Sequence, residues 1–294
     1  MGYEYNYANN ILNTFYNMKR LSFLIFGLAA LISCQKEAVV CDDVTAKEIA
    51  FQVEGDLDFN VETKATAVTS LNTFNVIAEN TSTATQVWSI SSVTKSGSNY
   101  LTAKYWPITD QKYAFYASNA AMTYSQQGAT IAVANANTDI VAAFSAYSAS
   151  NYKQAIGLTF NHIFARVGTF TVSAPSGYTV SNVSAVTMSA PVSGTYNVKN
   201  GTWSRGSAVS HTLSNGSNDV YVAPGDVTVT VTYTLTRGEY VKTFTKTATI
   251  SLVGGKINNI TATPSFAAGE EASEITLSVS LNAWGTQNHS VTLS

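Results

Sequence analysis

The clearest pattern in this sequence is a strict alternation of apolar and polar residues between positions 227 and 236. Every odd position carries Val, Tyr or Leu, and every even position carries Thr. Successive side chains of a strand point to opposite faces, so this stretch predicts a strand with one buried and one wet face. Arg237-Gly238-Glu239 predicts a turn, and the next strand, 240–252, again places its apolar residues on one face.

Similar short apolar or alternating runs recur every 8–15 residues, separated by turn residues and with almost no helical periodicity. A short helix between Ala114 and Ala149, where alanine is frequent, stays open. The pattern predicts an all-β chain of antiparallel β-sandwiches. One sandwich takes about 100 residues, so we expect two domains, 48–155 and 156–294. The other predicted strands are 49–53, 74–78, 86–93, 100–104, 113–117, 130–133, 140–144, 157–160, 166–173, 180–188, 194–198, 257–263 and 274–281.

The segment 18–34 has the organisation of a secretory signal peptide. Lys19 and Arg20 precede an uncharged, mostly apolar stretch, which ends in Leu31-Ile32-Ser33-Cys34. This ending is similar to the lipobox of bacterial lipoproteins, in which the cysteine is lipidated and becomes the new N-terminus. We therefore expect a signal peptide at 18–33, lipidation of Cys34, a tether at 34–47 and attachment to the outer membrane. Residues 1–17 carry no positive charge. We interpret them as a leader that results from a wrongly assigned start codon, and we expect translation to begin at Met18.

Composition excludes several classes of function. Charged residues make up only 12% of the chain, the formal net charge is −2, and no basic stripe appears, so we expect no binding to nucleic acid. The two cysteines, Cys34 and Cys41, could form a disulfide if Cys34 is not lipidated. The three histidines are widely spaced, so we expect no metal site and no cofactor.

No catalytic signature is present, and we expect the protein not to be an enzyme. Gly254-Gly255-Lys256 lacks the first glycine and the Ser or Thr of a phosphate-binding loop, which favours a glycine turn between strands. The four tryptophans, Trp88, Trp106, Trp203 and Trp284, could stack on sugars, although aromatic residues of β-sandwiches more often pack in the core. A surface glycan-binding lipoprotein without catalytic activity is therefore an alternative function.

A series of short motifs resembles the fimbrillin-like lipoproteins of Bacteroidales, the subunits of type V pili and their relatives. None of them is specific alone, but their order and spacing together carry the resemblance. They are the lipobox, the strand 49–53, Thr63-Lys64-Ala65, Tyr105-Trp106-Pro107, 113–117, 139–143, 158–162 with Arg166-Val167, 194–197 with Gly201-Thr202-Trp203, Val222-Ala223-Pro224, 254–258 and 275–284.

The resemblance implies two transthyretin-like β-sandwich domains and a structural or adhesive pilus subunit, either stalk, anchor or tip. It also implies assembly by donor-strand exchange, in which a protease cuts after a basic residue in the loop that follows the first strand. Lys64 stands where the family usually has arginine, so cleavage between Lys64 and Ala65 would need a protease that accepts lysine.

In the mechanism that the resemblance implies, removal of the first strand opens a groove that a terminal strand of another subunit fills. Candidate donor residues are Ile275, Leu277, Val279 and Leu281, with 290–293 as a second candidate, and both segments could instead be ordinary edge strands. The expected partners are other pilus subunits, the outer membrane through the lipid, and glycans or proteins of host or bacterial surfaces.

Overall fold

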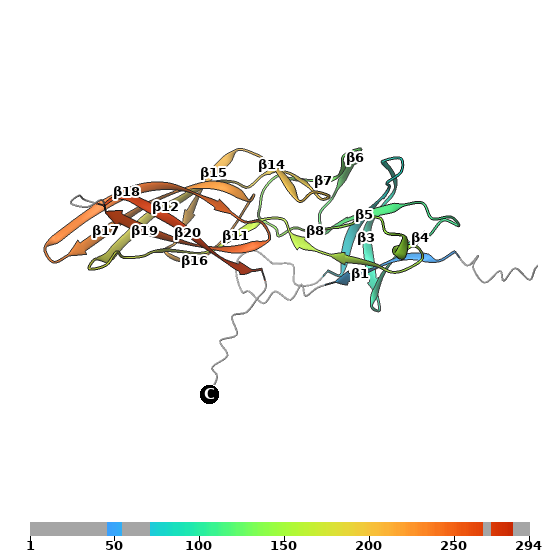
Figure 1. The fold of residues 1–294 in the computed structure, drawn as a ribbon, viewed down its shortest axis with the longest axis horizontal. Helices are drawn as coiled ribbons and strands as arrows, with labels where there is room; N and C mark the ends of the chain where they lie inside the picture. The colour runs from blue at the N-terminus through green and yellow to red at the C-terminus, as the bar shows by residue number, and fades with distance from the viewer. Residues whose placement is uncertain (1–45, 55–70, 267–271, 285–294) are drawn as a thin grey trace, which may run out of the picture. The chain divides into compact units, whose positions relative to one another are not determined.

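The computed structural model describes residues 46–54, 71–266 and 272–284, and these residues form an all-β structure (Figure 1). Its elements are strands, apart from one turn of 3-10 helix, η2 (Ala149–Asn151). The prediction of an all-β fold is confirmed. The expected antiparallel pairing has two exceptions among the described strands, since β1 pairs with β9 and β11 with β19 in parallel.

The first sheet has eight strands and closes back on itself. The chain passes from β9 to β10 through Phe160 alone, and these two strands occupy opposite ends of the sheet order. The sheet therefore curls around its own core, in which Phe51, Phe74 and Phe115 are buried. In order, its strands are β10 (Asn161–His162), β8 (Val141–Ser145), β5 (Tyr113–Ser118), β2 (Thr73–Asn80), β3 (Thr85–Ser96), β4 (Asn99–Tyr105), β1 (Glu48–Glu54) and β9 (Ile156–Thr159).

A sandwich of two four-stranded sheets follows, with a separate core that includes Phe170, Met188 and Tyr233. Strands β18 and β20, the edge strands on one side, contact each other across the sandwich (Figure 1, orange and red). One sheet has the order β16 (Gly216–Val222), β11 (Ala165–Val172), β19 (Lys256–Phe266), β20 (Ala272–Ala283). The other has the order β15 (Ala208–Leu213), β12 (Thr179–Pro191), β17 (Gly225–Arg237), β18 (Tyr240–Leu252).

A smaller sheet combines strands that are far apart in the chain. Its order is β14 (Thr202–Arg205), β13 (Gly194–Asn197), β7 (Gly128–Val133) and β6 (Thr123–Ser125), so β7 pairs with a strand more than 60 residues later. A third apolar cluster lies here, around Tyr116, Ile131 and Phe164. Because Phe115 enters the first core and Tyr116 enters this one, both faces of β5 are buried, which explains the uninterrupted apolar run 113–117.

The alternating strand behaves as its sequence predicts. In β17 the apolar residues from Val227 to Leu235 are buried, at 0–2% exposure. On the other face, Thr230, Thr232 and Thr234 form hydroxyl–hydroxyl hydrogen bonds of 2.8–2.9 Å with threonines of β18. Such cross-strand pairs contribute about 0.2–1 kcal/mol each. The burial of the odd positions fixes the register of this hairpin.

The domain boundary expected between residues 155 and 156 stays a prediction. Strand β9 begins at Ile156 but pairs with β1, and β10 pairs with β8, so the first sheet extends to His162. This pairing favours a boundary after His162. The division into 1–17, 18–33 and 34–47 lies outside the described residues, apart from the last two positions of the tether.

Candidate functional site

Strand β1 lies inside the first sheet, between β4 and β9. It runs antiparallel to β4, with Ala50 opposite Leu101, and parallel to β9, with Phe51 opposite Ile156. At the start of β1, the backbone N–H of Trp106 donates to the Lys47 carbonyl at 2.9 Å. One backbone edge of β1 therefore pairs with β4 over residues 48–51, and the other edge pairs with β9 over residues 51–54.

Alternate side chains of β1 enter the first core. Ile49 and Phe51 are fully buried, and Val53 packs partly against the same cluster. The Phe51 ring contacts Phe115 at a centroid distance of 5.2 Å and Phe74 at 6.2 Å, both edge to face. Burial of a side chain of this size contributes about 1.5–3 kcal/mol, so β1 is an integral part of the core.

The polar positions of β1 form hydrogen bonds at the surface. Glu48 Oε1 accepts from the Ala103 N–H at 2.6 Å, where a positive φ of 52° marks a bulge in β4. The Gln52 amide donates to Asn99 Oδ1 at 3.0 Å. Glu54 lies over Gly157, where an added Cβ would come within 2.0 Å of Oε1. The neighbouring strands thus contact both faces of β1, through hydrogen bonds on its polar face and through core packing on its apolar face.

The residues expected to be processed are not among those that the structure describes. Cys34, Lys64 and Ala65 fall in the ranges 1–45 and 55–70. Lipidation and cleavage stay predictions. What the structure adds is the position of β1, which directly precedes the segment that contains Lys64.

Strand β20 lies at the edge of its sheet and pairs with β19. Ile275, Leu277 and Val279 are half-buried against the second core, whereas Leu281 is 47% exposed. These four candidate donor residues thus share one strand, with one backbone edge that carries no partner strand among the described residues. The assignment of β20 as an edge strand holds in this structure, and its role as a donor stays a prediction. The second candidate, 290–293, lies outside the described residues.

The end of β20 is held by a cluster that the sequence did not reveal. The Trp284 indole stacks on the His162 imidazole, and His162 Nδ1 lies 2.7 Å from Asp139 Oδ2. All three residues are buried. Their positions in the chain are too far apart for spacing to pair them, although the expected motifs at 139–143, 158–162 and 275–284 each contain one of them.

The sequence from 48 to 284 matches the family model described as fimbrillin-like, which covers both candidate strands. The chain belongs to the fimbrillin-like family. A fimbrillin-like protein is a structural or adhesive subunit of the pilus type, at the cell surface, rather than a member of a catalytic family.

Solved structures similar to this fimbrillin-like chain come from Bacteroidales species. A candidate cell adhesion protein from Bacteroides eggerthii is 13% identical, with a TM-score of 0.45, over 82% of this chain and 98% of that one. A fimbrial assembly protein from Parabacteroides distasonis is 10% identical, with a TM-score of 0.41, over 81% and 99%. The tip fimbrial protein Mfa3 from Porphyromonas gingivalis, truncated at its C-terminus, is 9% identical, with a TM-score of 0.37, over 80% and 98%. No curated protein matches significantly.

Three further features are absent from the described residues of this fimbrillin-like protein. None of their His, Cys, Asp and Glu side chains form a group of three or more that could hold a metal ion. None of their helices is long and apolar enough to cross a membrane. Trp106 and Trp284 are buried and Trp88 and Trp203 are half-buried, so an exposed tryptophan platform for sugars is absent from this part of the chain.

Proposed function

We propose that this protein is a pilus subunit that joins the next subunit by exchange of β1. The observation that carries this proposal is the position of β1 between β4 and β9, with Ile49 and Phe51 fully buried. Loss of such a strand exposes two rows of backbone donors and acceptors and the pockets of two side chains. A strand from another subunit restores both the hydrogen bonds and the buried area.

The groove specifies the strand that fills it. A strand that reproduces the hydrogen bonds of β1 runs parallel to β9 and antiparallel to β4, with apolar residues at the positions of Ile49, Phe51 and Val53. A one-residue shift would turn these side chains to the wrong face, so the register is strongly determined.

We propose β20 as the donor because its sequence repeats that of β1. Glu48-Ile49-Ala50-Phe51-Gln52-Val53 aligns with Glu274-Ile275-Thr276-Leu277-Ser278-Val279, in which Glu, Ile and Val recur at the same places. Ile275, Leu277 and Val279 would replace Ile49, Phe51 and Val53. As an edge strand, β20 pairs with one described neighbour, so its release breaks a single ladder of hydrogen bonds.

Export and maturation complete the proposal. Lipidated Cys34 holds the precursor at the outer membrane, and two or three acyl chains make this attachment durable, since one chain binds weakly. Cleavage after Lys64 then separates Cys34 and β1 from the rest of the chain. The lipid would in that case serve for transport, and the mature subunit would be retained by its neighbours in the pilus.

The test is expression of the full chain with its signal in a Bacteroidales host. We expect a ladder of SDS-resistant oligomers whose subunits begin at Ala65. Lys64→Ala should abolish the ladder and leave a lipidated monomer, whereas Lys95→Ala, on the exposed part of β3, should leave the ladder unchanged. A ladder that persists in Lys64→Ala, or subunits that retain Cys34, would contradict the proposed maturation.

A further inference from the structure

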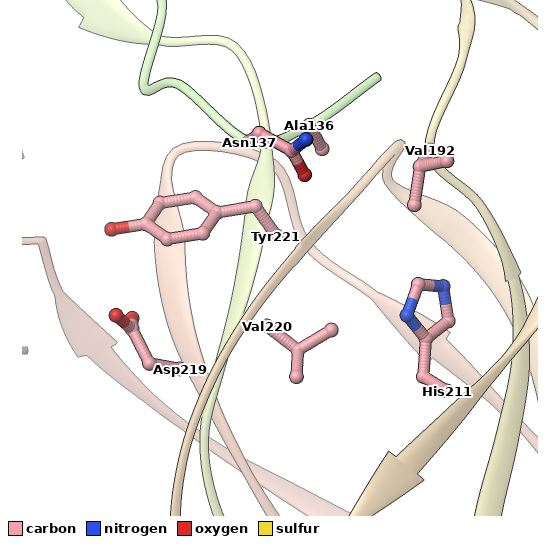
Figure 2. Close-up of a pocket in the computed structure, with 7 residues that line it drawn as sticks. All are labelled: Ala136, Asn137, Val192, His211, Asp219, Val220 and Tyr221. Atoms are coloured by element: carbon pink, nitrogen blue, oxygen red, sulfur yellow. The ribbon is translucent and has the colours of Figure 1, made fainter. Parts of the chain in front are cut away.

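A pocket of about 370 Å³ is lined by β15, β16 and the loops that follow β7 and β12 (Figure 2). Its polar groups do not converge on one ligand, because the Tyr221 and Asp219 side chains point away from Val192 and His211. The Tyr221 hydroxyl is also buried. The exposed surface of the molecule is therefore more informative about partners than this pocket.

Exposed apolar side chains gather at the strands that the proposed exchange involves. The described residues include eight large hydrophobic residues that are exposed. Leu101, Tyr105 and Ile108 lie on β4 or shortly after it, and a fourth, Leu281, lies on the proposed donor strand β20. Single exposed apolar residues are common, but a group of them beside one groove indicates an interface. We call Leu101, Tyr105 and Ile108 the apolar rim.

The apolar rim lies beside β1. Leu101 faces Ala50 of β1, and Tyr105 faces Glu48, the first residue of that strand. Ile108 follows Tyr105 by three positions, so the two Cα atoms are no more than about 11 Å apart. The rim therefore follows β4 towards the end of the groove at which β1 begins.

Ile108 is held in an exposed position. It is 86% exposed, while its carbonyl oxygen and that of Pro107 each lie 2.6 Å from the Tyr152 hydroxyl. The Tyr152 ring in turn packs edge to face on Trp106, with centroids 5.5 Å apart. Because these contacts fix the loop before any partner arrives, covering Ile108 costs little conformational entropy.

The proposed exchange brings a second copy of the chain to this rim. In the alignment of β20 with β1, Ala272 takes the place of Ala46, which precedes Lys47 and its hydrogen bond to the Trp106 backbone. Strand β19 ends at Phe266, six positions before Ala272, so at most about 22 Å separates the two. The sandwich of the donor subunit therefore emerges close to the apolar rim.

The end of the sandwich that emerges there carries an exposed valine. Val241, in β18, is 64% exposed and faces Thr236. Strand β11 ends at Val172, which faces Ala262 near the end of β19, and β12 begins at Thr179, which also faces Thr236. Because only six residues join β11 to β12, the end of β19 and the start of β18 lie at the same end of the sandwich.

We infer that the apolar rim of one subunit packs against the sandwich end of the next subunit, around Val241. This contact rests on the proposed strand exchange and adds a second interface between the same two subunits. It buries apolar residues that are exposed in the single chain. Burial of one isoleucine strengthens an association about tenfold or more.

A crosslink between subunits tests the contact. The full chain with its signal carries Ile108→Cys/Val241→Cys in the Cys41→Ser background and is treated on the cell surface with a short bismaleimide. We expect covalent dimers and higher oligomers that persist after boiling has dissociated the ladder. Ile108→Cys/Val253→Cys is the matched control and should give none, because Val253 is 41% exposed but follows the opposite end of β18.

The strength of the contact is measured from the loss of the ladder in heated SDS. Ile108→Ser should shorten the half-life of the ladder about tenfold, whereas Ile108→Leu and Val253→Ser should leave it unchanged. Since Ile108 is exposed in the single chain, adding Ile108→Ser to the uncleaved Lys64→Ala chain should not move its urea midpoint.

The outcomes separate this contact from strand exchange. Ladders that form normally, but give no covalent dimers with Ile108→Cys/Val241→Cys or have the same half-life in Ile108→Ser, would overturn the contact and leave strand exchange intact. Equal yields of dimers with Val253→Cys would also overturn it. Absence of any ladder from the wild type would overturn strand exchange and this contact with it.

Discussion

The Trp284 indole lies flat on the His162 imidazole, with ring centroids 4.2 Å apart and planes 6° from parallel. Trp284 is the last described residue after β20, whereas His162 belongs to β10 of the first sheet. The stack therefore ties the end of the proposed donor strand to a strand 122 positions earlier. Tyr221, at 5.4 Å from the same indole, supports it from β16.

We expect Trp284→Ala to loosen β20. Removal of a buried tryptophan costs about 3–5 kcal/mol, and here the loss falls at one end of an edge strand. Hydrogen exchange of the β20 amides should accelerate more than that of β17. Trp88→Ala, which removes a half-buried indole packed on Phe115, should destabilise the first core without this local effect on β20. Equal acceleration of β20 in both variants would contradict the role of the stack.

The proposed donor register can be captured with a disulfide between subunits. Thr276 takes the place of Ala50 in the alignment, and Ala50 faces Leu101 in β4. A Thr276→Cys/Leu101→Cys variant should therefore give disulfide-linked oligomers once strands have exchanged. The Cys41→Ser background removes the competing thiol that precedes Lys64.

The matched control uses the unexchanged register, in which Thr276 faces Thr263. Thr276→Cys/Thr263→Cys should form a disulfide within one subunit before assembly. If Thr276→Cys/Leu101→Cys links within a monomer, or never links in material that forms ladders, β20 is not the donor in this register.

Phe51→Ala should destabilise the precursor strongly. Phe51 is fully buried between Phe74 and Phe115, and Phe→Ala substitutions at such sites cost about 3–5 kcal/mol. Gln52→Ala, on the exposed face of the same strand, should change the free energy of unfolding by no more than about 0.5 kcal/mol. Urea denaturation of the uncleaved chain measures both, and equal effects would show that β1 is not anchored by its apolar face.

Stability should fall as the pH rises above about 10. Burial, followed by the hydrogen bond to Glu79, raises the pKa of Tyr116 far above its ordinary value of 10.0. Below pH 10 this tyrosine is protonated in both states, so its contribution is fully present. Above pH 10 the unfolded chain releases the proton while the folded chain keeps it, which lowers the free energy of unfolding by up to about 1.4 kcal/mol per pH unit. Denaturation followed by tyrosinate absorbance checks this.

Tyr116→Phe separates the two contributions of that residue. At neutral pH it leaves the buried Glu79 carboxylate without the Tyr116 donor, so we expect a loss of about 1–3 kcal/mol. Above pH 10 its stability should fall less steeply than that of the wild type. Tyr105→Phe, at a residue that is 56% exposed, should change neither quantity.

Gly194→Ala should disrupt the small sheet. Gly194 has φ +146°, and an added Cβ would lie 2.4 Å from the Ser204 carbonyl oxygen in the paired strand β14. We expect a loss of about 1–3 kcal/mol. Gly97→Ala is the control, because Gly97 has φ +63° but open space around it, so only the backbone penalty of about 1–2 kcal/mol applies. Thermal unfolding in which Gly97→Ala is the more damaged variant would contradict this account.

Local patterns were sufficient to predict most strands. The threonine alternation predicted β17, and the turn at Arg237-Gly238-Glu239 predicted the start of β18. A strand with one buried and one solvent-exposed face alternates apolar and polar residues, so its sequence shows a period of two. Strands β15 and β16 were missed. Their sequences, AVSHTL and GSNDVYV, mix polar and apolar residues without a clear period, and both strands are only partly buried.

The sequence by itself therefore determined the all-β class, most of the strand positions and the two matching apolar patterns at 49–53 and 275–279. Only the tertiary structure decided that β1 lies between β4 and β9, that β20 lies at an edge, and that His162, Tyr221 and Trp284 meet. Period-two alternation shows which face of a strand is buried but contains no information on which strand lies beside it. That choice depends on contacts between residues that are distant in the chain, and these contacts exist only when the sheets have formed.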